Sequence, residues 1–176
     1  MITSEQLSEA LDCPLERAQK WCKPINAAMR EFDINTNERI AAFIAQIGHE
    51  SGRLVYVKEI WGPTASQRGY EFRHDLGNDS AGDGYTYRGR GLIQITGRAN
   101  YRICGKALRL DLELHPELLE QPDIASRSSG WFWKTHGCNE LADNGDFVAI
   151  TKRINGGLNG QPERLALLES TTTALA

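Results

Sequence analysis

The chain has 176 residues, enough for one compact domain with a small additional lobe. Its share of 40% hydrophobic and 24% charged residues is ordinary for a soluble globular protein, and a net charge of -3 does not suggest a nucleic-acid-binding protein. No apolar run is long enough to span a bilayer, and the first residues lack the pattern of a signal peptide. We therefore expect a single domain over residues 1–176, made in the cytoplasm and not inserted in a membrane.

Charge is unevenly distributed in the second half of the chain. Residues 85–110 contain six basic side chains and no acidic one, whereas residues 111–123 contain five acids. The basic side chains are Arg88, Arg90, Arg98, Arg102, Lys106 and Arg109. One interpretation is two solvated surfaces of opposite sign. The other is a basic wall beside a site that receives an acidic polymer.

Three helices are predicted in the first third of the chain. Thr3 and Ser4 can cap a short first helix, and Pro14 suits the first turn of a second helix that runs toward Phe32. A third helix is predicted to open at Asn35, which with Glu38 resembles a capping box. Its apolar residues recur at the spacing of one buried helix face and are Ile40, Phe43, Ile44 and Ile47.

The middle of the chain has a different texture. Five glycines and a proline interrupt residues 61–87, which predicts loops, a short helix or a small hairpin. Helical patterns return after Thr96, after Pro116, from Pro122, over residues 146–154 and near Gln161. The sequence therefore predicts a mainly helical fold with a small loop-rich part. The four cysteines have no C-x-x-C spacing, so reduced and mostly buried thiols are expected.

Glu50 falls on the apolar face of the predicted third helix. It lies three residues after Ile47 and seven after Phe43, so it continues the buried stripe. Burial disfavours the charged form of a carboxyl group, and a general acid has to hold its proton near neutral pH. The position therefore suits an acid catalyst. The alternative is a glutamate that frays into solvent at a helix end, next to Ser51 and Gly52.

A second glutamate, Glu59, follows nine residues later. The apolar run 54–57 before it should be anchored in the interior, and Gly62 and Pro63 behind it begin a loop. Catalytic groups concentrate on loops that a rigid scaffold holds. Two carboxylates across a cleft can protonate a leaving oxygen and activate a water, as inverting glycosidases do. A pair of glutamates at this spacing is by itself a weak signal.

The segment 85–97, with the sequence YTYRGRGLIQITG, strengthens this hypothesis. Gly89 and Gly91 permit close backbone approach, and Gln94 and Thr96 would share one side if the stretch is extended. Amide and hydroxyl groups on one side can hold a water or sugar hydroxyls. The segment lacks the Gly-Lys-Ser/Thr of a phosphate loop, and its alternative role is a turn between packed segments.

Three blocks together resemble the signature motifs of glycoside hydrolase family 19. They are His49-Glu50-Ser51-Gly52, the Tyr-x-Gly-Arg-Gly-x-Ile-Gln-x-Thr segment and Ile154-Asn155-Gly156-Gly157. That family contains chitinases and related peptidoglycan-cleaving endolysins of phages. The resemblance implies a lysozyme-like helical domain with a substrate cleft, and an inverting mechanism without a cofactor or metal.

The resemblance also implies residue roles. Glu50 matches the general acid, Glu59 the general base, and Thr96 the hydroxyl that helps to position the water. Further matches that bind sugar, orient the water or contact the carboxylates are Gln94, Asn100, Asn155 and Arg164. Two positions depart from the common chitinase pattern, Leu92 where proline is usual and Thr96 where serine is usual. Glu71, at a more distant spacing, competes with Glu59 for the role of base.

Other chemistry is not supported by the sequence. Arg53 stands where a helical zinc protease needs its second histidine. The stretch 79–90 resembles a calcium loop but has Ala81 at a ligand position and Arg90 where the bidentate glutamate belongs. Aromatic residues that could stack on sugar rings are Trp61, Tyr85 and Tyr87, whereas the cluster 131–133 is assigned to the core.

Taken together, these features predict an endolysin that cuts the glycan strands of bacterial peptidoglycan as a monomer. Made in a host cytoplasm, it would reach the wall after release through a phage holin. A chitinase acting on N-acetylglucosamine polymers is the alternative. A non-catalytic wall-binding module and a zinc amidase are more remote.

Overall fold

The apolar stripe predicted for the third helix is buried along its length. In the computed structural model, which describes residues 1–176, this helix is α3 (Asn37–Glu50), and every residue from Ile40 to Gly48 is buried. Thr36, not Asn35, caps it, because the Thr36 hydroxyl accepts the hydrogen bond of the Arg39 amide. The predicted capping box of Asn35 and Glu38 is therefore wrong: the cap lies one residue later, and Arg39 stands at the position of the reciprocal Glu or Gln. A helix enclosed by the core fixes the position of Glu50 at its end.

The chain forms ten α-helices and two short 3-10 helices, with only isolated β-bridges between them. The predicted mainly helical fold is confirmed. Besides α3, the elements in chain order are α1 (Ser4–Leu11), α2 (Leu15–Glu31), α4 (Ala65–Arg68), η1 (His74–Leu76), α5 (Asp83–Thr86), α6 (Arg98–Leu108), η2 (Pro116–Glu120), α7 (Pro122–Thr135), α8 (Cys138–Asp143), α9 (Phe147–Asn155) and α10 (Gln161–Ala174). None of these helices has the length and apolar character needed to cross a membrane.

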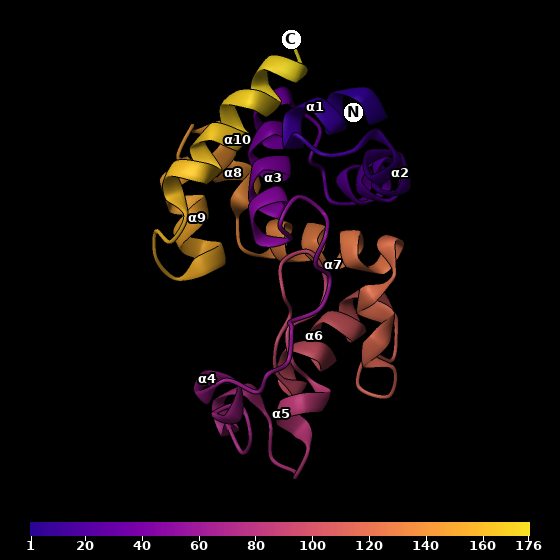
Figure 1. Ribbon diagram of the computed structural model, residues 1–176, viewed down its shortest axis with the longest axis vertical. Helices are drawn as coiled ribbons and strands as arrows, with labels where there is room; N and C mark the ends of the chain where they lie inside the picture. Colours follow the sequence, from indigo (N-terminus) through magenta and orange to yellow (C-terminus); the bar gives the residue numbers. More distant parts are fainter.

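The helices are arranged in two lobes (Figure 1). In the larger lobe α3 packs against α8 and α10, α1 packs against α2 and α10, and a core of 26 buried residues fills the interior. The smaller lobe contains α4, α5 and α6 and has a separate core of seven buried residues around Tyr101. The long connection between α3 and α4 runs from one lobe to the other (Figure 1). Glu59 lies on this connection.

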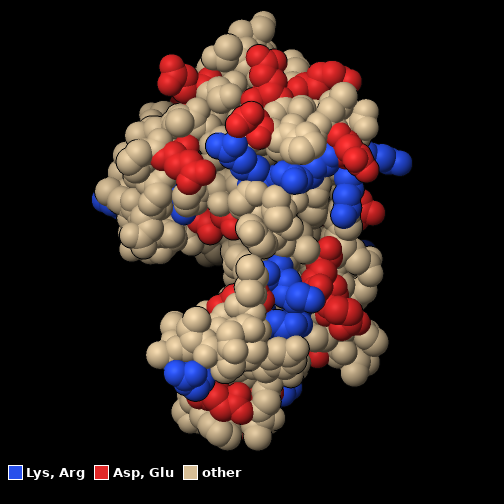
Figure 2. Space-filling view, in the orientation of Figure 1, with Lys and Arg blue, Asp and Glu red and all other residues tan.

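A deep hollow separates the two lobes on one face of the molecule (Figure 2). Acidic side chains are visible on both of its edges (Figure 2). α3 lies antiparallel to α10, and Glu50 at the end of α3 pairs with Arg164 near the start of α10. The C-terminal end of α3 is directed toward the smaller lobe (Figure 1). The two lobes thus form the walls of a cleft.

Two local predictions differ from the structure. The sequence pattern did not indicate the six-residue helix α8, because this helix begins after Gly137, which has a positive φ of 67°, and no side chain caps it. Residues 91–94 form a turn, not an extended stretch, with φ values of 82° at Gly91 and 58° at Gln94. Cys13, Cys104 and Cys138 are buried free thiols, and Cys22 is half-buried, which agrees with the predicted burial.

Candidate active site

Glu50 and Arg164 form an ion pair at the edge of the cleft. An Nη2 atom of Arg164 lies 2.5 Å from Oε1 of Glu50, and the side chains are 1% and 18% exposed respectively. The resemblance implied that Arg164 contacts a catalytic carboxylate, and the structure places it on Glu50. Burial by itself disfavours the charged form of a carboxyl group. The guanidinium acts in the opposite direction, because a neighbouring positive charge stabilises a carboxylate.

Arg164 is held rigidly by acceptors from separate segments. Its Nη1 donates to the side-chain oxygen of Gln46 on α3, and its Nε donates to the carbonyl of Asn159, 3.1 Å away. A guanidinium has five donors and no acceptor, so a buried one needs several oxygens around it. These contacts fix the direction from which the positive charge faces Glu50.

Glu59 is held by neutral donors of the smaller lobe. Its backbone amide donates to the Gly89 carbonyl at 2.8 Å, and the Gly89 amide donates to Oε2 of Glu59 at 3.1 Å. Oε1 accepts hydrogen bonds from Gln67 Nε2 at 3.0 Å and from the Tyr70 hydroxyl at 3.3 Å. Burial raises the pKa of Tyr70, and the nearby Glu59 charge raises it further, so the phenol stays protonated and donates. These neutral donors contact both carboxylate oxygens and fix the orientation of the Glu59 side chain.

Glu71 is tied to the backbone of its own loop. Its two carboxylate oxygens accept hydrogen bonds from the amides of Gly82 and Gly84 at 2.6 and 2.9 Å. The side chain thus closes the loop before α5, whereas Glu59 is hydrogen-bonded to Gly89, beside Gln94 and Thr96. This geometry favours Glu59 over Glu71 as the candidate base.

Gly89 brings Gln94 and Thr96 close to the backbone that carries Glu59. A methyl group added at Gly89 would lie 2.7 Å from Oε1 of Gln94 and 3.3 Å from Oγ1 of Thr96. Gln94 donates its Nε2 to the Gly91 carbonyl at 2.9 Å, which leaves its Oε1 directed at Gly89. The turn therefore places both side chains on one side, as the sequence predicted for an extended stretch, but by a different backbone path.

A pocket of about 330 Å³ adjoins this cluster. Gln94, Thr96 and Asn100 supply polar atoms to it, and Trp131 and Phe132 supply aromatic surface. Polar groups beside aromatic faces suit a sugar ring, which has an apolar face and hydroxyl edges. Of the residues 131–133 that were predicted as core, Trp133 is fully buried, whereas Trp131 and Phe132 are half-buried: each packs against a core and also lines this pocket. Adjacent positions on a helix point in different directions, so a run of three aromatic residues cannot all face the core.

Unpartnered polar atoms lie at the end of α9 and the start of α10. Oδ1 of Asn155 and both side-chain polar atoms of Gln161 are buried and have no hydrogen-bond partner. Such atoms are rare in folded proteins, and a ligand or water satisfies them. Asn155 was predicted as a sugar-binding residue, whereas Gln161 carries no sequence signal beyond its place at the start of a helix.

Two of the predicted aromatic platforms have different surroundings. Tyr87 is 4% exposed, and its hydroxyl donates to the Glu113 carbonyl at 3.1 Å, so it belongs to the core of the smaller lobe. The prediction that Tyr87 stacks on a sugar is therefore corrected, because no ring face is accessible. Trp61 is half-buried and packs edge-on against the exposed Tyr85, with ring centroids 5.4 Å apart. This pair offers accessible aromatic surface.

The basic block is mostly neutralised by the acidic stretch that follows it. Arg90 pairs with Glu120 at 2.8 Å, and both Arg98 and Arg102 pair with Glu113. Arg88 is buried against the Tyr85 ring, with 4.1 Å between its guanidinium carbon and the ring centroid. Arg88, Lys106 and Arg109 form no ion pair, and of these three only Lys106 and Arg109 are exposed. The basic wall predicted beside the site is therefore reduced to these two side chains.

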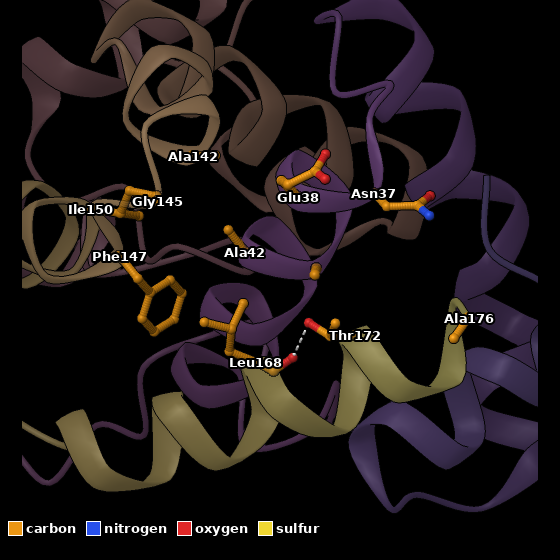
Figure 3. A pocket seen from close by; sticks show the side chains of 11 residues that line it. Asn37, Glu38, Ala42, Ala142, Gly145, Phe147, Ile150, Leu168, Thr172 and Ala176 are labelled. Atoms are coloured by element: carbon orange, nitrogen blue, oxygen red, sulfur yellow. Dashed lines mark hydrogen bonds between the residues drawn. The ribbon is translucent and has the colours of Figure 1, made fainter.

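An apolar cavity of about 400 Å³ lies elsewhere, at the beginning of α3 (Figure 3). It is lined by Glu38 of α3, Phe147 and Ile150 of α9, and Leu168 of α10, among others. Twelve residues of α3 separate Glu38 from Glu50, which at the helical rise is about 18 Å. The cavity is therefore not part of the carboxylate site.

A family model described as chitinase class I, glycoside hydrolase family 19, matches residues 22–148. A family 19 domain-containing protein from Haemophilus influenzae is 38% identical over an alignment of 156 positions that covers 72% of this chain and 75% of that protein. The chain belongs to glycoside hydrolase family 19. It is accordingly a glycoside hydrolase that acts on glycan polymers.

Other family 19 proteins share parts of the sequence and the whole fold. An endochitinase of Arabidopsis thaliana is 35% identical over 102 residues, 57% of this chain but only 37% of that enzyme. This chain thus spans well under half of the plant chitinase. The crystal structure of a bacterial family 19 chitinase superposes with a TM-score of 0.81 and 26% identity over 99% of this chain and 95% of that chain. These matches support the lysozyme-like helical architecture with a cleft.

Proposed function

We propose that Glu50 is the general acid and Glu59 the general base of an inverting hydrolysis of glycosidic bonds. The observation that carries this proposal is the different environment of the two carboxyl groups: one faces a buried guanidinium, and the other accepts hydrogen bonds from neutral donors only. When Glu50 donates its proton to the leaving oxygen, it becomes negative. Arg164 stabilises that developing charge, which lowers the barrier to proton transfer.

The attacking water is assigned to the side of the cleft that carries Glu59. Glu59 accepts a proton from this water, while the Thr96 hydroxyl and the free Oε1 of Gln94 orient it. In an inverting enzyme the two carboxyl groups stand about 6.5–9.5 Å apart, which leaves room for the water between base and sugar. Asn100, Asn155 and the pocket beside Trp131 then hold the flanking sugars.

The preferred substrate in this proposal is the glycan strand of bacterial peptidoglycan, cut by a phage-type endolysin. Peptidoglycan carries carboxylates, and the exposed Lys106 and Arg109 supply positive charge without a competing ion pair. In this proposal the protein is released to the wall through a holin and acts as a monomer. Chitin is the second candidate, and the relatives named endochitinases favour it. Chitin and the bacterial wall share N-acetylglucosamine as a building block.

A parallel digestion tests the substrate. Purified wall glycan and chitin oligomers are each incubated with the wild-type enzyme and with Glu50→Gln, and the products are identified by mass spectrometry. The proposal expects wall fragments with a new reducing end, formed faster than chitin fragments and absent with Glu50→Gln. Faster cleavage of chitin oligomers would establish the chitinase alternative, and binding to walls without any product would indicate a non-catalytic module.

A further inference from the structure

A buried network of hydrogen-bonded side chains continues from Glu50 into the larger lobe. Gln46 lies one turn before Glu50 on α3 and is fully buried, and its side-chain oxygen accepts the hydrogen bond of Arg164 Nη1. Its Nε2 donates to the hydroxyl oxygen of Thr151 on α9 at 2.9 Å. Thr151 is also fully buried. This hydrogen-bond network thus connects α9, α3 and α10 and ends at the carboxylate of Glu50.

The Thr151 hydroxyl determines which way the Gln46 amide points. Its proton is donated to the Phe147 carbonyl at 3.2 Å, so its oxygen can only accept from Gln46. The NH₂ group of Gln46 must therefore face Thr151, and its carbonyl oxygen must face Arg164. With the amide reversed, NH₂ would meet the guanidinium and two donors would confront each other without an acceptor.

The acceptor that Gln46 offers to Arg164 is neutral. Glu50 is the carboxylate that forms an ion pair with Arg164, and no second carboxylate forms an ion pair with this guanidinium. The other charged groups on these elements have different partners or face solvent. His49 of α3 lies 2.9 Å from Glu163 of α10, and Lys152 and Arg153 of α9 are exposed. The positive charge of Arg164 is consequently directed to Glu50 alone.

We propose that Gln46 and Thr151 are positioning residues for the catalytic acid: Thr151 orients the Gln46 amide, and Gln46 holds Arg164 against Glu50 without adding a second negative charge. The inference rests on the proposed role of Glu50 as general acid. It goes beyond that role because neither residue touches the cleft or belongs to the three sequence motifs. Their effect on the rate passes through the orientation and the charge balance of Arg164.

Thr151→Val tests the orientation step. Valine has nearly the same shape but no hydroxyl, so the Gln46 amide loses the partner that sets its direction. We expect kcat to fall roughly 2- to 10-fold, the equivalent of one hydrogen bond, with KM nearly unchanged. Thr151→Ser keeps the hydroxyl and should restore most of kcat. Soluble oligomers of whichever glycan the wild-type enzyme cleaves serve as substrate.

Thr171→Val is the matched control. Thr171 is equally buried, and its hydroxyl donates to the Leu167 carbonyl at 2.7 Å one turn earlier, just as Thr151 donates to Phe147. Thr171 makes no hydrogen bond to Gln46 or Arg164. The substitution therefore removes the same kind of hydrogen bond without changing the network that links Thr151, Gln46 and Arg164. A loss of kcat in Thr171→Val equal to that in Thr151→Val would overturn the inference, because the loss would then follow from helix packing.

Gln46→Glu tests the charge balance. The introduced carboxylate still accepts from Arg164, but it shares the positive charge, so Glu50 should keep its proton to higher pH. The alkaline limb of the pH profile of kcat/KM should therefore move to higher pH, a change that a structural role would not produce. An unmoved limb would contradict the inference. If Glu50→Gln is itself fully active, the proposed function fails instead, so the two failures are distinguishable.

Discussion

Gly89→Ala is the substitution whose effect the structure defines most sharply. The Gly89 carbonyl accepts a hydrogen bond from the Glu59 backbone amide, and the Gly89 amide donates to the Glu59 carboxylate. A methyl group at Gly89 would lie 2.7 Å from Oε1 of Gln94. No real Cβ contact is that short, so the Gln94 side chain has to withdraw by several tenths of an ångström. Gly89 is not among the glycines with positive φ, so alanine fits the backbone, and only the neighbouring side chains have to move.

The expected loss of activity follows from that displacement. A misplacement of about 1 Å in a catalytic arrangement can cost about 10²-fold in rate, so a smaller shift of Gln94 and Thr96 should lower kcat by roughly 10- to 100-fold. The free energy of unfolding should fall by only about 1–2 kcal/mol, because the strain is local. The assay is steady-state hydrolysis of the preferred glycan, with thermal unfolding measured on the same preparation.

Gly157→Ala provides the control for this experiment. It adds the same methyl group to a loop near Asn155, where the nearest atom, Oδ1 of Asn155, would be 3.8 Å away, an ordinary contact. As a control for stability, it should leave the free energy of unfolding within about 0.5 kcal/mol of wild type, because the added methyl group meets no steric conflict. A fully active Gly89→Ala would refute the idea that Gln94 and Thr96 act from their present positions.

Three further results are expected. Thr96→Val should lower kcat roughly tenfold with little change in KM, because the hydroxyl acts on the attacking water; a change in KM alone would contradict this role. The hydrogen bonds from Arg98 hold the pKa of the buried Asp83 below its usual range, so their stabilisation is present above about pH 4 and is lost as the pH falls through the lowered value. Asp83→Asn should therefore lower the free energy of unfolding by about 1.5–3 kcal/mol at pH 7. Denaturant titrations should show that this difference between wild type and variant becomes smaller in acid. Burial raises the pKa of Cys104 to about 12, so alkylation of the native protein at pH 8 should spare Cys104 and modify the half-buried Cys22 first; rapid labelling of Cys104 would show that its burial is wrong.

The sequence predicted the helices well because their signals are local. The apolar stripe of α3, the prolines at Pro14 and Pro122 and the glycine that ends α9 each specify an element without knowledge of its neighbours. Glu50 could be placed on a buried face from the same periodicity. What periodicity could not indicate was the guanidinium beside it, because Arg164 is more than a hundred residues away along the chain.

The parts that were wrong or missing depend on tertiary contacts. The burial of Tyr87 and the ion pairs of Arg90, Arg98 and Arg102 arise where the smaller lobe folds its basic and acidic stretches together. A charge pattern along the sequence cannot distinguish solvated charges from paired ones. The unpartnered atoms of Gln161 likewise become visible only when the end of α9 and the start of α10 are placed in space.

The central claim is that Glu50 donates the proton that releases the leaving sugar. The most direct measurement is kcat of folded Glu50→Gln on the glycan that the wild-type enzyme hydrolyses. Glutamine keeps the shape and can still accept from Arg164, but it has no acidic proton to give. The account predicts a fall in kcat of about 10²- to 10⁴-fold with an unchanged fold. Wild-type turnover by this variant would contradict it.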